Sequence, residues 1–137
     1  MYPKEHAITS TAAVLLYAIA SGVDAPTTSL WAAIAVVSTI AIDVDHLLVL
    51  LARGDFSHIR MFLADPFVVF RSPAKIKDEI YFKGFGGIRL VSHSAVIATA
   101  YLVSERLAPN LTAPLMLSLI VHFALDVWDY IENPQDR

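Results

Sequence analysis

Long apolar runs separated by short polar breaks dominate the chain. Four such runs cover residues 7–23, 28–52, 88–108 and 111–131. Each is close to the roughly 20 mostly apolar residues that a helix needs to cross a bilayer. The first two runs carry almost no polar stripe before Asp43, whereas a helix on the surface of a soluble protein presents such a stripe to water. The pattern favours an all-α, integral membrane bundle of four transmembrane helices over four buried helices of a soluble bundle.

Turn-forming residues group these runs into two hairpins. Gly22, Asp24 and Pro26 separate the first run from the second, and Pro109-Asn110 separates the third from the fourth. Both connections are short, so we expect each pair of helices to form an antiparallel hairpin. The first run is not preceded by the positively charged region of a signal peptide, so we expect a retained helix.

Residues 53–87 form the one long connection, between the second and third predicted helices. Its first half has apolar residues at helical spacing, namely Phe56, Ile59, Phe62, Leu63, Phe67 and Phe70. Polar residues lie between them, which predicts an interfacial amphipathic segment interrupted near Pro66. Ser72-Pro73 then has the pattern of an N-cap followed by proline at the first helical position, which predicts a short charged helix.

Composition narrows the class of protein. Only 17% of the 137 residues are charged, against about 25% in a typical soluble domain. The net charge of −3 offers no basic face to nucleic acid, so membrane lipids are the expected surroundings and nucleic acid is not an expected partner. The absence of cysteine excludes disulfides, thiolate zinc sites and cysteine nucleophiles. The length fits a single membrane domain, residues 1–137.

Basic residues predict the orientation. Seven of the ten Lys and Arg residues lie in the long connection or at its edges: Arg53, Arg60, Arg71, Lys75, Lys77, Lys83 and Arg89. In a four-span topology Lys4 and Arg137 fall on the same side, and only Arg106 falls on the other. By the positive-inside rule, we expect a multi-pass protein of the cell membrane whose two termini and long connection are cytoplasmic.

Ionisable residues interrupt the apolar runs at matching depths. The second run carries Asp43, Asp45 and His46, the third Arg89 and His93, the fourth His122, Asp126 and Asp129, and His6 precedes the first. A charge inside hydrocarbon costs about 2.5–3.5 kcal/mol even on the insertion scale. Because the topology places these residues near the cytoplasmic end of every helix, we expect them to converge in one site.

The residue types in this set are those of a metal centre. Asp43 and His46 are spaced i,i+3, and His122 and Asp126 are spaced i,i+4, so each pair shares a helix face. The predicted ligands are His6, Asp43, His46, His93, His122 and Asp126. Imidazole and carboxylate ligands suit zinc, with manganese or iron as alternatives, and six of them fit two ions better than one. The alternative is a hydrogen-bonded core without metal.

The same motifs resemble those of the membrane-bound metal-dependent hydrolase family. The resemblance covers His6 at the start of the first helix, Asp-x-Asp-His at 43–46, Arg89 before Ser-His-Ser at 92–94, and His-x-x-x-Asp at 122–126. The long insertion between the second and third motifs resembles the family's archaeal branch. The motif logic is similar to that of bacterial zinc-dependent phospholipase C. This resemblance implies hydrolysis of phosphoesters or lipid headgroups.

Three other residues complete the predicted mechanism. A metal-activated water would be the nucleophile, with Asp45 or Asp129 accepting its proton. Arg89 would clamp a phosphate group, although a salt bridge to Asp126 or Asp129 is an alternative. Two rival functions stay open: a metal-stapled structural or partner-binding membrane protein, and a cation or proton transporter. An oligomer is compatible with each.

Overall fold

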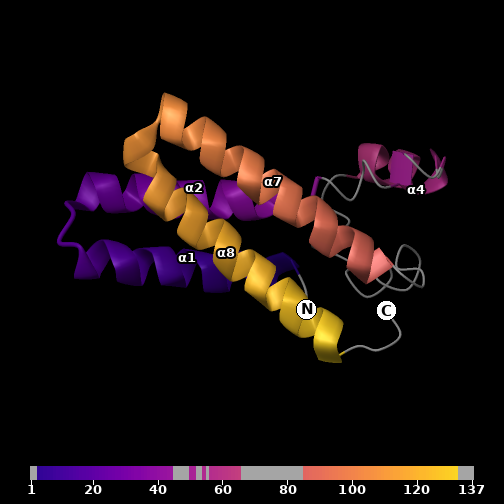
Figure 1. Ribbon diagram of the computed structural model, residues 1–137, viewed down its shortest axis with the longest axis horizontal. Helices are drawn as coiled ribbons and strands as arrows, with labels where there is room; N and C mark the ends of the chain where they lie inside the picture. The colour runs from indigo at the N-terminus through magenta and orange to yellow at the C-terminus, as the bar shows by residue number, and fades with distance from the viewer. Residues whose placement is uncertain (1–2, 45–49, 52–53, 55, 66–84, 133–137) are drawn as a thin grey trace.

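The computed structural model describes residues 3–44, 50–51, 54, 56–65 and 85–132. All elements in these residues are helical, which confirms the predicted all-α class. The helices are α1 (Pro3–Ala20), α2 (Ala25–Ile42), α4 (Phe56–Ala64), α7 (Phe85–Leu107) and α8 (Pro109–Glu132) (Figure 1).

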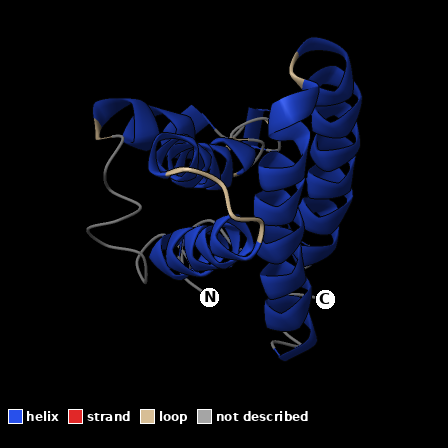
Figure 2. Ribbon diagram, turned by 90° about the vertical axis from the view of Figure 1, so that its left-hand side faces the viewer, coloured by secondary structure: helices blue, strands red, loops and turns tan. Residues whose placement is uncertain are grey.

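The long helices form the two predicted hairpins. In the first turn, Gly22 takes a positive φ of 65°, and Asp24 caps α2 by accepting a hydrogen bond from the Thr27 N–H at 2.9 Å. Ala108 alone separates α7 from α8. Helix α8 packs against α1, α2 and α7, so it joins the two hairpins (Figure 2).

The buried face of α1 divides the core into layers. It repeats every four residues, at His6, Ser10, Val14 and Ala18. This spacing keeps side chains on one side of a helix. Val14 and Ala18 pack with Trp31 and Ala35 of α2 in an apolar layer next to the hairpin turns. His6 lies at the opposite end, and the hydroxyl of Ser10 lies between the two.

A layer of hydroxyl groups surrounds Ser118 of α8. Its Oγ donates a hydrogen bond to the Ala35 carbonyl at 3.1 Å. The hydroxyls of Ser38 and Thr39 each lie 3.1 Å from the same Oγ. Ser10 donates to the Ser118 carbonyl at 3.2 Å. Every one of these hydroxyls has a hydrogen-bond partner. The layer therefore joins α1, α2 and α8 without burying an unpaired hydroxyl group.

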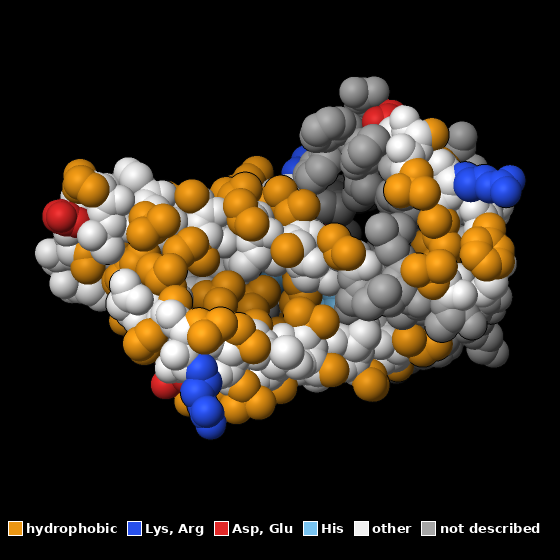
Figure 3. All heavy atoms as spheres, turned by 90° about the horizontal axis from the view of Figure 1, so that it is seen from above, with side chains coloured by type: hydrophobic (Ala, Val, Ile, Leu, Met, Phe, Trp, Pro, Cys, Tyr) orange, Lys and Arg blue, Asp and Glu red, His pale blue; other side chains and the backbone are white. Residues whose placement is uncertain are grey.

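Within the part of the chain that the structure describes, three helices, α2, α7 and α8, are long and apolar enough to cross a membrane. Their outer surfaces carry exposed large side chains such as Val37 and Leu102, each 65% exposed, and hydrophobic side chains are spread along the face in Figure 3. Helix α1 differs because it ends at Ala20. Its apolar part, residues 7–20, rises only about 21 Å, against about 30 Å of hydrocarbon. The fourth span stays a prediction.

Helix α2 is shorter than predicted. It ends at Ile42, with Asp43 as its C-cap, instead of continuing to residue 52. The Val44 N–H bonds the Ala41 carbonyl at 3.1 Å, which closes a tighter turn than the α-helical one. The expectation that Asp43 lies within a continuous helix is therefore wrong. Residues 45–49 lie outside the described residues.

Helix α4 matches the first half of the predicted amphipathic segment. Phe56 and Leu63 are exposed on it, at 60% and 75%. The rest of that prediction, including the helix expected after Ser72-Pro73, falls in residues 66–84, outside the described part of the chain.

Replacing Ser118 tests the hydroxyl layer. Ser118→Leu should lower the free energy of unfolding by about 1–3 kcal/mol, since three added carbons do not fit between α1, α2 and α8. Ser118→Ala should cost only about 0.5–1.5 kcal/mol, because Thr39 still donates to Ala35. Denaturant unfolding in detergent micelles measures both. Equal effects of the two variants would contradict close packing around Ser118.

Candidate metal centre

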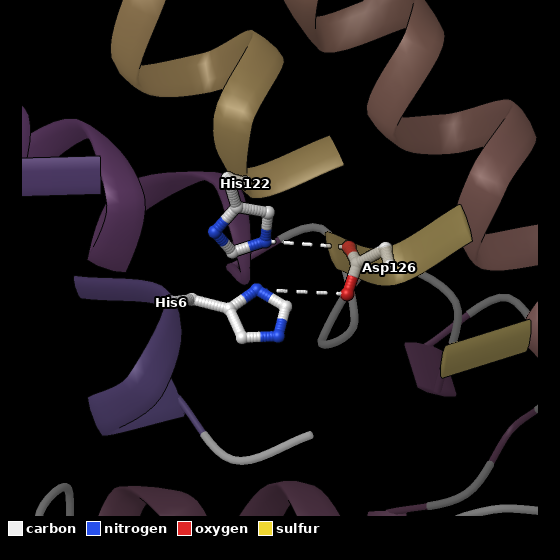
Figure 4. A group of neighbouring side chains, drawn as sticks. All are labelled: His6, His122 and Asp126. Atoms are coloured by element: carbon white, nitrogen blue, oxygen red, sulfur yellow. Dashed lines mark ion pairs between the residues drawn. The ribbon is translucent and has the colours of Figure 1, made fainter. Parts of the chain in front are cut away.

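The carboxylate of Asp126 lies at the centre of the polar cluster. Asp126 is 2% exposed, and groups from three helices lie around it. Its Oδ1 is 3.7 Å from His6 Nδ1 of α1 and 3.4 Å from Arg89 Nη2 of α7. Its Oδ2 is 3.1 Å from His93 Nε2 of α7 and 3.3 Å from His122 Nε2 on its own helix. Figure 4 shows the rings of His6 and His122 next to each other, each facing one oxygen of this carboxylate.

Asp43 adds a second carboxylate from the end of α2. Its Oδ1 is 3.5 Å from His122 Nε2 and 3.7 Å from His93 Nε2. As the C-cap residue, Asp43 approaches the cluster from the helix end instead of from a helix face. The early end of α2 therefore shapes this side of the site.

The three imidazole rings are close neighbours. The centroid of the His122 ring is 4.4 Å from that of His6 and 5.4 Å from that of His93. Two ligand groups result, one of His6, His122 and Asp126, and one of Asp43, His93 and His122, and the ligand atoms within each lie within 4.8 Å of one another. His122 belongs to both groups, so the two candidate metal sites lie next to each other and share one ligand residue.

The spacing of these atoms fits a bound metal ion. Two ligand atoms at zinc distances of 2.0–2.2 Å and a tetrahedral angle lie about 3.3–3.6 Å apart. His122 Nε2 lies 3.3 Å from Asp126 Oδ2 and 3.5 Å from Asp43 Oδ1. The buried His6 Nδ1, Asp126 Oδ2 and both His122 nitrogens make no hydrogen bond of good geometry within the described chain. Except for His122 Nδ1, these atoms lie 3.1–3.7 Å from an ionisable partner, so the same positions suit ion pairs as well as a bound ion.

The protonation state of His6 also suits metal binding. Burial lowers the pKa of His6 to about 4, a shift that the nearby Asp126 carboxylate only partly opposes. His6 is therefore neutral at pH 7, and a neutral imidazole is the form that binds a metal. Its contact with Asp126 is then between a neutral ring and a carboxylate, and it does not neutralise the carboxylate's charge.

Arg89 is the one guanidinium that the described residues contribute to the cluster. It is 5% exposed. Its Nη2 lies 3.4 Å from Asp126 Oδ1 and 3.7 Å from Asp129 Oδ2, and it donates a hydrogen bond to the Asp126 carbonyl at 3.5 Å. The structure therefore has the salt bridge that the sequence offered as the alternative to a phosphate clamp. Asp126 and Asp129 share this cation, and Asp43 lies beside His93 and His122, so among the described residues the cluster holds three carboxylates and one guanidinium.

Most of the predicted site is brought together. Seven of its residues lie in or beside the cluster: His6, Asp43, Arg89, His93, His122, Asp126 and Asp129. Asp45 and His46 lie outside the described residues. Sequence reasoning missed the hydroxyl layer beneath the cluster. Its signal was present in the spacing, since Ser10 follows His6 by four residues and Ser118 precedes His122 by four.

Removing the guanidinium tests the electrostatics of the cluster. In chelator-treated protein, Arg89→Met should lower the free energy of unfolding by about 3–5 kcal/mol, because it leaves buried carboxylates without their cation. Arg106→Met is the matched control, an exposed arginine in the last turn of the same helix. It should stay within about 0.5 kcal/mol of the wild type. Thermal unfolding in detergent compares them, and similar losses would refute a buried ion pair.

Comparisons of the chain with protein-family models, with curated proteins and with solved structures find no match. The resemblance to metal-dependent hydrolases therefore stays a prediction, and the geometry of the cluster is what a functional proposal must explain.

Proposed function

We propose that this chain is a membrane-embedded, metal-dependent hydrolase of phosphoesters. One observation carries the proposal: imidazoles and carboxylates from α1, α7, α8 and the C-cap of α2, all buried except the half-buried Asp43, meet in two ligand groups that share His122. The groups combine three histidines with two aspartates, a donor set that suits zinc. Isolated core histidines have no physical reason to meet in this way inside apolar helices.

The chain's own residues would hold the cation, accept a proton and position the carboxylates. The two ligand groups would hold a divalent cation, which would supply Lewis acidity toward water and toward a phosphoryl oxygen. Asp129 is 7% exposed and belongs to neither ligand group, so we assign it the role of proton acceptor. Arg89 lies between Asp126 and Asp129 and holds both carboxylates in place. A substrate phosphate would share this guanidinium with them.

A structural metal site or polar core is the second candidate. The observation that favours it is the 3.1 Å contact between His93 and Asp126. Together with Arg89, this contact compensates much of the negative charge of Asp126 without any metal ion. Transport has less support. The hydroxyl layer extends the polar groups one helical turn beyond the cluster, but the layer of Val14, Ala18, Trp31 and Ala35 then closes the bundle.

We also propose that α1 is a fourth span and that both termini lie in the cytoplasm. Helix α1 packs along α2 and α8, two of the helices that can cross a membrane, and it exposes Leu16 and Ile19. The orientation follows from the nine-to-one distribution of Lys and Arg. It places the cluster near the cytoplasmic face.

Zinc content and hydrolysis, measured together, test the proposed function. Purified wild-type protein should retain zinc by elemental analysis and hydrolyse p-nitrophenyl phosphate in detergent. Asp126→Asn should lose the zinc and lower the rate by at least about 100-fold, the upper range for disturbing a metal site's surroundings. Glu132→Gln removes one carboxylate charge at an exposed position of the same helix, and it should change neither quantity.

The possible results separate the candidates. Bound zinc that raises the melting temperature without any hydrolysis would assign the site to the structural alternative, since an ion at a hundred times its Kd adds about 2.7 kcal/mol. Folded protein that binds no zinc would leave an ion-paired polar core and refute the hydrolase.

Cysteine labelling tests the topology. The chain has no cysteine, so Lys77→Cys and Arg106→Cys each create a single thiol. In intact cells, an impermeant maleimide should label the Arg106→Cys variant and should reach the Lys77→Cys variant only after the cells are opened. The reverse pattern would invert the protein and move the cluster to the outer face.

A further inference from the structure

An apolar groove of about 460 Å³ lies between α2 and α7, with α8 as its third wall. It is lined by Ala33, Val37 and Ala41 of α2, Val96 and Ala100 of α7, and Leu119 of α8, among others. Its volume is in the range of small-molecule sites, about 300–1,000 Å³. In Figure 3 hydrophobic side chains line a hollow on this face, and a histidine is visible at one end of it.

The groove offers no polar group to an occupant along its length. Ser38 is its one polar lining residue. The hydroxyl of Ser38 lies 3.2 Å from the Ala35 carbonyl and 3.1 Å from Ser118, so it is already hydrogen-bonded to α2 and α8. A hydrocarbon chain fills such a groove without leaving a polar group unpaired.

The groove leads into the polar cluster. Along the sequence, Ala41 lies two residues before Asp43, Val96 three residues after His93, and Leu119 three residues before His122. On a helix, three residues are about 4.5 Å of rise. On each of the three helices, a predicted metal ligand therefore lies within about one helical turn of an apolar residue that lines the groove.

The length of the groove matches one leaflet. From Ala33 to Ala41 the α2 wall rises about 12 Å. Half of a bilayer's hydrocarbon core is about 15 Å thick. A chain lying along the groove would reach from near the bilayer midplane to the depth of the cluster, where its polar head would meet the histidines and aspartates.

We propose that the groove binds an acyl chain of a phosphate-bearing lipid and presents its headgroup to the cluster as the substrate. This inference rests on the proposed hydrolase function and names its substrate class. With phosphatidic acid, the reaction adds one water across the P–O ester bond. The water oxygen bonds to phosphorus, the ester bond breaks, a proton passes to the glycerol oxygen, and diacylglycerol and inorganic phosphate leave.

Photo-crosslinking with two lipid probes tests the proposal. One probe is phosphatidic acid with a diazirine in its acyl chain, and the other is diacylglycerol with the same chain but no phosphate. Each is added to zinc-loaded protein in phosphatidylcholine vesicles, and labelled peptides are mapped by mass spectrometry. Phosphatidic acid should label residues of α2, α7 and α8 that line the groove at least tenfold more than diacylglycerol, and inorganic phosphate should compete only weakly.

Two variants of α7 separate the groove from the general lipid surface. Ala100→Phe places a ring in the groove and should lower phosphatidic acid labelling at least tenfold while zinc content is retained. Ala98→Phe is the matched control: the same change two residues away, at an exposed position that does not line the groove. It should label like the wild type.

Three results would overturn the inference while leaving the metal site intact. The first is equal labelling by both lipids, which would indicate boundary lipid only. The second is labelling that Ala100→Phe does not change. The third is a dimer in detergent that this variant dissociates, which would assign the groove to a second copy of the chain. Failure of the proposed function is recognised separately, by the absence of zinc from folded wild-type protein.

Discussion

The buried carboxylate of Asp126 is the constraint around which the bundle is built. An ionised group at 2% exposure inside apolar helices is tolerable only when neighbouring groups compensate it. Here His6, Arg89 and His93 approach it from other helices, and His122 approaches from one turn away on α8. Satisfying this one group fixes the rotation of α1, α7 and α8 about their axes, and with it the faces that remain for lipid.

The same rotation produces the layered interior. Once His6 and His122 face each other, the residues four positions along their helices, Ser10 and Ser118, must also meet. The apolar side chains of Val14 and Ala18 follow on the same stripe of α1. The interior therefore changes from charged to hydroxyl to apolar in the space of a few turns. A bound ion would lie at one end of this gradient, and hydrocarbon contacts dominate the other.

Sequence reasoning located what depends on periodicity and failed where tertiary packing decides. The hairpins, the helices around His93 and His122 and the shared depth of the ionisable residues all follow from apolar spacing and turn residues. The end of α2 at Ile42 does not, because Val44 has an apolar side chain and the tight turn there is a backbone event. The sequence did not decide the partner of Arg89, because a phosphate and an aspartate can accept hydrogen bonds from the same guanidinium N–H groups. The groove could not be predicted, because the spacing of apolar residues does not determine which pairs of helices leave a space between them.

The distribution of charge between the two hairpins bears on how the protein enters a bilayer. Arg89, Asp126 and Asp129 all belong to the α7–α8 hairpin, where the guanidinium already contacts both carboxylates. This hairpin can partition into lipid as a partly neutralised unit, so the cost of moving charge into hydrocarbon falls before any other helix is present. The α1–α2 hairpin carries its charged groups and its histidine near its ends and in its turn, at Lys4, Glu5, His6, Asp24 and Asp43. Each half is therefore suited to independent insertion, and the polar cluster is completed only when the halves associate laterally.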